Sequence, residues 1–156
     1  MVLAGIRKLG PTGFTLVELT VAVAAIAILA VVSVPFFNAY YQATKLRAAA
    51  DAMVSILNGA RYQAIKHNTT ICVAVSGHRL QYHVGGCGGA VWLGTETDGA
   101  GFVTLPTTVE LTGATANVVF TNLGAASVGG TYTIRNPADG RSLTVTVAGS
   151  GRITIP

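Results

Sequence analysis

The sequence predicts an α+β protein in which one long N-terminal helix packs on an antiparallel β-sheet globular head. Two observations lead to this prediction. Residues 14–67 combine an apolar run with an amphipathic stretch, both at helical spacing. After Asn68 the pattern changes to short β-rich segments that are separated by glycine-containing turns. We therefore expect the helix first and the sheet-forming head after it.

The apolar run covers residues 14–37 and contains a single charge, Glu18. About 20 apolar residues cross a bilayer core of roughly 30 Å, so the run is long enough to span a membrane. The simplest alternatives are a signal anchor and a secretory signal. A secretory apolar region usually has about 7–15 residues and ends in a small-residue cleavage site. This run is longer and no such site closes it, which argues against a secretory signal.

A short basic leader, residues 1–13, precedes the run. Arg7 and Lys8 favour a cytoplasmic location for this end, because positive charges flank membrane helices on the cytoplasmic side. Pro11 and Gly13 keep the end of the leader extended and accessible to a protease. The rest of the chain is then expected on the far side of the membrane.

From residue 38 to residue 67 the helical pattern continues as an amphipathic stretch. The predicted stripe recurs at alternating steps of four and three and consists of Ala39, Ala43, Leu46, Ala50, Met53, Leu57, Ala60 and Ala64. Its many alanines would let a sheet approach the helix closely. A helix from Phe14 to about His67 would be about 80 Å long at 1.5 Å per residue. Pro35 removes one backbone hydrogen bond and is expected to kink or loosen it.

The β-rich part, residues 68–156, contains a series of short predicted strands. Gly, Asn-Pro and Asp-Gly punctuation between them is typical of hairpins. Residues 85–108 give the weakest pattern. The predicted strands are 70–75, 80–84, 91–93, a segment starting at 102–103, 109–111, 116–121, 131–135, 142–147 and 152–155.

The two cysteines, Cys72 and Cys87, lie 15 positions apart. Location outside the cytoplasm permits a disulfide, and a loop of this size would stabilise the fold by roughly 3 kcal/mol in the chain-entropy model. A metal site or a reactive thiol is the alternative, as is a buried free Cys72 beside an exposed Cys87. No CxxC spacing or second cysteine pair indicates a metal. We favour the disulfide.

Composition gives little support for catalysis. The chain has ten basic and six acidic residues, and removal of the leader leaves eight bases, so the mature chain is only mildly basic. No nucleophile elbow, zinc-protease, P-loop or dinucleotide motif is present. We therefore predict no enzyme, no cofactor, no metal site and no small-molecule substrate.

The stretch from Gly13 to Leu19, with the apolar helix and Pro35 after it, closely resembles the N-terminus of type IV prepilins and type II secretion pseudopilins. The resemblance implies cleavage between Gly13 and Phe14 by a prepilin peptidase, followed by N-methylation of Phe14. It also implies that Glu18 helps to dock a new subunit by pairing with the N-terminal amine of a neighbour. The physics fits, because a lone carboxylate in hydrocarbon requires a cation.

Further segments resemble minor pilins of the FimT or GspH type: the helix around Asp51 to Asn68, and residues 119–124, 140–143 and 151–153. The resemblance implies a type IV pilin-like fold with other pilins or pseudopilins as partners. It also implies a single-pass protein of the bacterial inner membrane with a periplasmic head. The expected function is a structural minor pilin that helps to initiate or cap a type IV pilus. A minor pseudopilin of the type II secretion system is the first alternative.

A second alternative is a minor pilin that binds double-stranded DNA for uptake in natural transformation. The candidate residues are Arg135, Arg141 and Arg152, since arginines on loops contact phosphates without reading sequence. DNA-binding members of the FimT type carry a Gly-Arg-x-Arg motif near the C-terminus. This chain has Thr154 in place of the second arginine, which weakens the transfer of that role.

Overall fold

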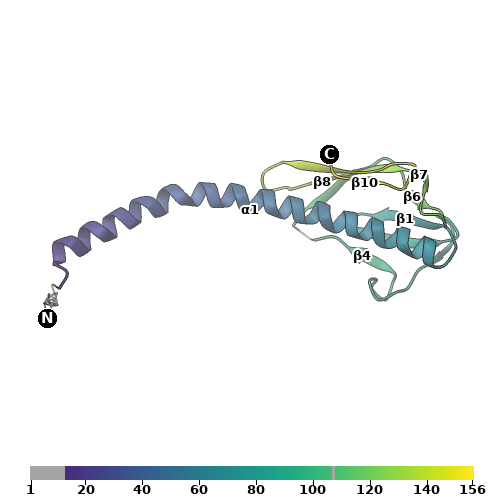
Figure 1. The fold of residues 1–156 in the computed structure, drawn as a ribbon, viewed down its shortest axis with the longest axis horizontal. Coiled ribbons are helices and arrows are strands. Elements are labelled where there is room, and N and C mark those ends of the chain that lie inside the picture. Colours follow the sequence, from purple (N-terminus) through teal and green to yellow (C-terminus); the bar gives the residue numbers. More distant parts are fainter. Residues whose placement is uncertain (1–12, 107) are drawn as a thin grey trace, which may run out of the picture. The chain divides into compact units, whose positions relative to one another are not determined.

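A computed structural model describes residues 13–106 and 108–156. Within these residues, one helix, α1 (Leu16–Lys66), is followed by ten strands (Figure 1). The chain divides into two compact units, one ending at Ala39 and one covering Tyr40–Pro156, and each is described by itself. The predicted α+β class is confirmed. Arg7, Lys8 and Pro11 of the predicted leader lie outside the described residues.

Helix α1 has the predicted extent and continues through Pro35. Its end is fixed by Asn68, which adopts a left-handed conformation with φ of 49°. The Thr69 amide donates to the Ala64 carbonyl at 3.0 Å, and the Asn68 amide donates to Ile65 at 3.2 Å. These two bonds form a Schellman cap, in which glycine or asparagine is the preferred left-handed residue.

The first sheet has the path β3-β2-β1-β6-β7, with β4 also paired to β2. Its centre is the predicted hairpin of β1 and β2, in which Ser76 is opposite Arg79. The turn between them begins with Gly77 at φ of 62°, a conformation that costs glycine little. The bounds are β1 (Ile71–Ser76), β2 (Arg79–Val84), β3 (Ala90–Val91), β4 (Phe102–Thr104), β6 (Val118–Phe120) and β7 (Ala126–Val128).

The second sheet has the order β10-β9-β8-β5, and all its pairs are antiparallel. Strands β8 and β9 form its longest hairpin, with Arg135 opposite Ser142. A register shift in β5 between Leu111 and Gly113 marks a bulge. The bounds are β5 (Glu110–Ala114), β8 (Gly130–Arg135), β9 (Ser142–Val147) and β10 (Ile153–Thr154).

Both sheets share one core with the C-terminal half of α1. In Figure 1 this half of the helix passes between the region of β8 and β10 and that of β4. The helix contributes Leu46, Ala49, Ala50, Met53, Ile56, Leu57, Ala60 and Ala64 to the core, all at most 9% exposed. Six of these belong to the predicted stripe.

The structure corrects three details of the sequence prediction. Ala39 and Ala43 are exposed, so the buried stripe begins only at Leu46. Strand β7 was not predicted, because Ala126–Val128 is too short to show an alternating pattern. Trp92 and Leu93 lie outside the short strand β3; the Trp92 ring packs instead against His67, with 4.8 Å between the ring centroids.

Candidate functional site

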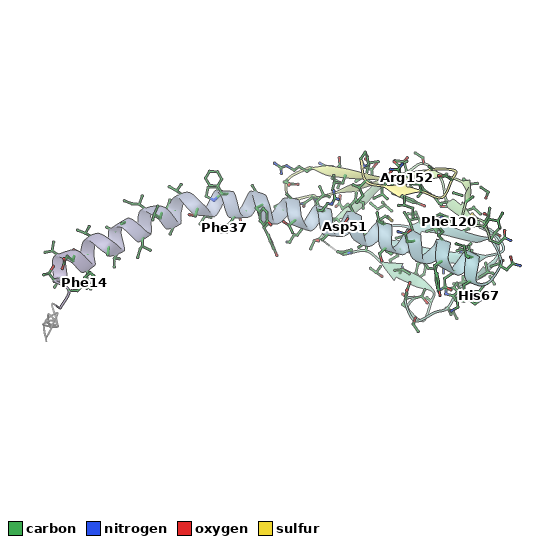
Figure 2. All side chains as sticks on the ribbon, viewed as in Figure 1. Phe14, Phe37, Asp51, His67, Phe120 and Arg152 are labelled. Atoms are coloured by element: carbon green, nitrogen blue, oxygen red, sulfur yellow. A yellow bond between two sulfur atoms is a disulfide. The ribbon has the colours of Figure 1, made fainter. Side chains whose placement is uncertain are left out.

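The first half of α1 exposes its apolar side chains (Figure 2). Its large hydrophobic residues between Phe14 and Phe37 are 57–83% exposed. The hydroxyl groups within the run bond to the helix itself: Thr20 donates to the Val17 carbonyl at 2.8 Å and Ser33 donates to Leu29 at 2.7 Å. Within the described residues, helix α1 is long and apolar enough to cross a membrane. This surface therefore presents hydrocarbon with its hydroxyl groups already satisfied.

Glu18 forms a capping box with Thr15 at the start of α1. The Thr15 amide and hydroxyl both donate to Glu18 Oε2, at 3.0 and 2.8 Å, and the Glu18 amide donates back to Thr15 Oγ1 at 3.2 Å. Such reciprocal bonds satisfy amides at a helix start that have no partner within the helix. The partnership of Thr15 was not predicted, although the T-x-x-E spacing is visible in the sequence.

Gly13 and Phe14 lie immediately before the helix, outside any regular secondary structure. A Cβ atom added to Gly13 would meet no atom within 4 Å, and the Phe14 ring is 83% exposed. The peptide bond between them is therefore open to solvent. Nothing within the described residues crowds this position.

Cys72 and Cys87 are joined by a disulfide. Cys72 is fully buried in β1, whereas Cys87 is exposed in the glycine-rich turn after β2. The bond thus fastens this turn to the centre of the first sheet. The predicted disulfide is thus confirmed, and the alternative of a buried free Cys72 beside an exposed Cys87 is wrong.

The three candidate arginines do not gather at one place. Arg135 and Arg141 lie at the same end of the second sheet, on either side of the turn between β8 and β9. Arg152 lies beside Ala148, to whose amide its carbonyl is bonded, at the other end of β9. Seven residues of extended chain separate Ala148 from Arg141, or about 23 Å. The DNA prediction remains a prediction, with two of its three arginines at one location.

Two buried polar contacts tie the head to the helix, and the sequence did not indicate them. The Tyr82 hydroxyl donates to the Ile56 carbonyl at 2.7 Å, and burial raises the pKa of Tyr82. Asn136 is 1% exposed, and its amide Nδ2 donates to Gln42 Oε1 at 3.0 Å. Because an unpaired buried amide is costly, this bond holds the β8–β9 turn at Gln42.

We compared the chain with known protein families and solved structures. The family described as type II transport protein GspH matches residues 49–151. No curated protein sequence matches the chain.

Solved structures agree on the fold at low sequence identity. The minor pseudopilin EpsH of the Vibrio cholerae type 2 secretion system is 15% identical, with a TM-score of 0.58 over 72% of this chain and 96% of that one. The Pseudomonas aeruginosa type IV minor pilin FimU is 17% identical, with a TM-score of 0.54 over 71% and 92%. Escherichia coli GspH is 16% identical, with a TM-score of 0.56 over 72% and 88%.

The match to the GspH family covers most of the head together with the helix that supports it. The long apolar helix before it completes a type IV pilin-like architecture. The chain belongs to the family described as type II transport protein GspH.

Proposed function

We propose that this protein is a minor pilin that helps to initiate or cap a type IV pilus. The observation that carries the proposal is the exposed apolar half of α1, which bears one carboxylate near its start. Exposed apolar surface of this extent requires lipid or other protein around it. A lipid bilayer before assembly and the helices of neighbouring subunits after assembly would supply that environment.

The proposed processing follows the sequence prediction. The leader, residues 1–13, is removed by a prepilin peptidase, and the new N-terminal amine of Phe14 is methylated. Residues 14–37 then serve as inner-membrane anchor and assembly helix, residues 38–67 carry the head, and residues 68–156 form it in the periplasm. The solvent-open peptide bond after Gly13 supports this order, because a peptidase must reach it.

Glu18 is the proposed docking residue. In the single chain its carboxylate bonds to Thr15, yet hydrogen bonds alone do not neutralise its charge. The Phe14 amine of a neighbouring subunit would supply the missing cation. In a low-dielectric surrounding such a charge-assisted bond is stronger than a neutral one.

Substitution of Glu18 by glutamine separates docking from helix capping. Glutamine also accepts hydrogen bonds in a capping box, so Glu18→Gln should keep the start of the helix but lose the charge. Because the neutral glutamine cannot form an ion pair with the amine, crosslinking to other pilins should fall about tenfold or more. Crosslinking of the Glu18→Ala variant should fall equally, whereas the Thr15→Ser variant should crosslink normally.

Mass spectrometry of the extracted protein supplies the control for processing. The Glu18 and Thr15 variants should all begin at methylated Phe14, whereas Gly13→Leu should retain the leader. Normal crosslinking of a correctly processed Glu18→Gln protein would contradict the docking role. A native protein that begins at Met1, or is cut after residue 37, would contradict the pilin-like processing itself.

A second candidate is a minor pseudopilin of the type II secretion system. The family description favours it, as does the structural likeness to EpsH. Both candidates assemble through the same helix, so the Glu18 experiment does not distinguish them. Deletion of the protein does: loss of surface pili with normal secretion supports the pilus, and loss of secretion with normal pili supports the pseudopilus.

A further inference from the structure

One end of the head, here called the proximal pole, combines the start of its helix with the turn between β8 and β9. We define it as Tyr40, Tyr41, Lys45 and residues 136–141. The turn is fixed there by Asn136, whose buried amide is bonded to Gln42 Oε1 at 3.0 Å and lies 3.5 Å from the Gln42 carbonyl oxygen. Within the turn, the Ala138 amide donates to Asn136 Oδ1 at 3.0 Å and the Asn136 amide to the Arg141 carbonyl at 2.8 Å.

The chain itself limits how far this pole can lie from the apolar run. Gln42 follows Phe37 by five residues within the same helix, α1. Five residues of chain span at most about 18 Å whatever their conformation. Because Asn136 bonds directly to Gln42, the turn stays at this level along the helix. Tyr40 follows Phe37 by three residues, which span at most about 11 Å in any conformation of the chain. A bilayer that encloses the run up to Phe37 therefore has its headgroup layer within reach of the pole.

The exposed side chains of the pole have the chemistry of a membrane interface. Tyr40 is 73% and Tyr41 57% exposed, and Lys45 Nζ lies 4.2 Å from the centroid of the Tyr41 ring. Tyrosine is enriched at the headgroup level, because its ring is apolar and its hydroxyl is polar. In the turn, Pro137 and Ala138 are exposed, with Arg135 and Arg141 on either side.

Charge favours lipid headgroups over a highly charged polymer. Four bases lie at or near the pole, and three acids accompany them. Arg47 pairs with Asp51 at 3.6 Å, and Arg141 with Asp139 at 3.8 Å. Arg135 lies opposite Glu110 in the paired strands. The excess is one positive charge, contributed by Lys45, which is too small to attract a polyanion strongly but suits a phosphate-bearing lipid surface.

We propose that the proximal pole rests on the phospholipid headgroup layer next to the apolar run, with Tyr40, Tyr41 and the β8–β9 turn in contact with it. This inference rests on the membrane anchoring proposed above. A weak contact is sufficient to keep the pole at the membrane, because its covalent link to the anchor raises the effective concentration of the pole at the surface. The head would then occupy a restricted position before assembly rather than rotating freely.

Single tryptophan reporters in the full chain test the inference. The native tryptophan is first removed by Trp92→Phe. The protein is then reconstituted in vesicles of phosphatidylethanolamine and phosphatidylglycerol that carry lipids brominated near the headgroup. Reporters at the pole are Tyr41→Trp and Ala138→Trp. The distal control is Leu123→Trp, at an 85% exposed site in a turn that packs near Ile65. Ile65 lies about 35 Å along the helix from Gln42.

Both pole reporters should be quenched several-fold more strongly than the distal control. An anchor reporter, Ala27→Trp, separates the two proposals. If Ala27→Trp is not quenched by lipids brominated deep in the acyl chains, the membrane anchoring fails. If Ala27→Trp is quenched but Ala138→Trp behaves like Leu123→Trp, the anchoring stands and the headgroup contact is overturned.

The bond to Gln42 provides the matched test of geometry. Gln42→Ala removes the Oε1 acceptor without changing the turn, and should lower the quenching of Ala138→Trp while leaving that of Tyr41→Trp unchanged. Asn136→Ala should have the same effect, with circular dichroism to verify that the head is folded. Unchanged quenching of Ala138→Trp in a folded Gln42→Ala protein would overturn the role assigned to this bond.

Discussion

The two halves of α1 both carry large apolar side chains, but these side chains have opposite surroundings. Between Phe14 and Phe37 the large apolar side chains are 57–83% exposed, whereas from Leu46 to Ala64 the inward-facing ones are at most 9% exposed. The second half packs against two sheets of its own chain. Apolar area removed from water is worth about 25 cal/mol per Å² wherever it is buried. The comparison teaches that the first half must obtain this free energy from outside the chain.

The largest expected effect comes from a truncation in the buried half. Leu57 is fully buried, so Leu57→Ala should lower the free energy of unfolding of the head by about 2–5 kcal/mol. Leu29 is 67% exposed, so the matched Leu29→Ala should leave it unchanged. Denaturant unfolding in detergent, followed by Trp92 fluorescence, measures both. Equal destabilisation by the two variants would contradict the difference drawn between the buried and the exposed half of α1.

Loss of the disulfide should act on the head alone. The bond closes a loop between positions 15 apart, so replacing Cys72 and Cys87 by alanine should lower head stability by roughly 3 kcal/mol. Extraction of the protein from membranes by detergent depends on the first half of α1 and should not change. A double variant with altered extraction would show that the two halves depend on each other.

Alkaline pH should unfold the head through its buried tyrosines. Burial raises the pKa of Tyr132 to about 12, whereas an unfolded tyrosine titrates near 10. The free energy of unfolding of the head is therefore independent of this ionisation below pH 10. It falls as the pH rises from 10 to 12, by about 1.4 kcal/mol per pH unit for each such group. Tyr132→Phe should make this decline shallower. An unchanged slope would assign the alkaline effect to other residues.

The smallest effect should come from the helix ends. Asn68 carries the left-handed cap within the head, and Asn68→Ala forces alanine into that conformation at a cost of about 1 kcal/mol. Asn68→Gly should be nearly neutral. Thr15→Ala removes the cap at the other end and should leave head unfolding unaltered. Destabilisation of the head by Thr15→Ala would mean that the apolar half contributes to its folding.

The sequence predicted the elements well where one residue pattern decides them. Helical spacing located α1 to within two residues of each end, and the Ser76-Gly77 turn between two β-rich segments located the first hairpin. The fold class followed from the same patterns, whereas the family came from the resemblance of Gly13 to Leu19 and of segments in the head to known pilins. Strand β7 escaped prediction because only its pairing with β6 makes it a strand.

The sites were less predictable because they depend on long-range contacts. The three arginines are close in sequence, yet the hairpin of β8 and β9 carries Arg141 and Arg152 to opposite ends of a strand. The bond between Asn136 and Gln42 joins residues 94 positions apart. No local pattern marks such a partner, so neither residue stood out. The capping box of Thr15 and Glu18, in contrast, follows from a local T-x-x-E spacing that is visible in the sequence.

The burial of eight residues of α1 within the head also has a mechanical consequence. As the filament subunit proposed above, the protein would experience tension along its helix when the filament is pulled. Within the head, that load would act on the contacts of Leu46, Met53 and Leu57 simultaneously, because they project from one rigid helix into one core. Contacts loaded in parallel must yield together, whereas contacts loaded in series open one after another. The buried stripe therefore resists sliding of the helix relative to the sheets of the head.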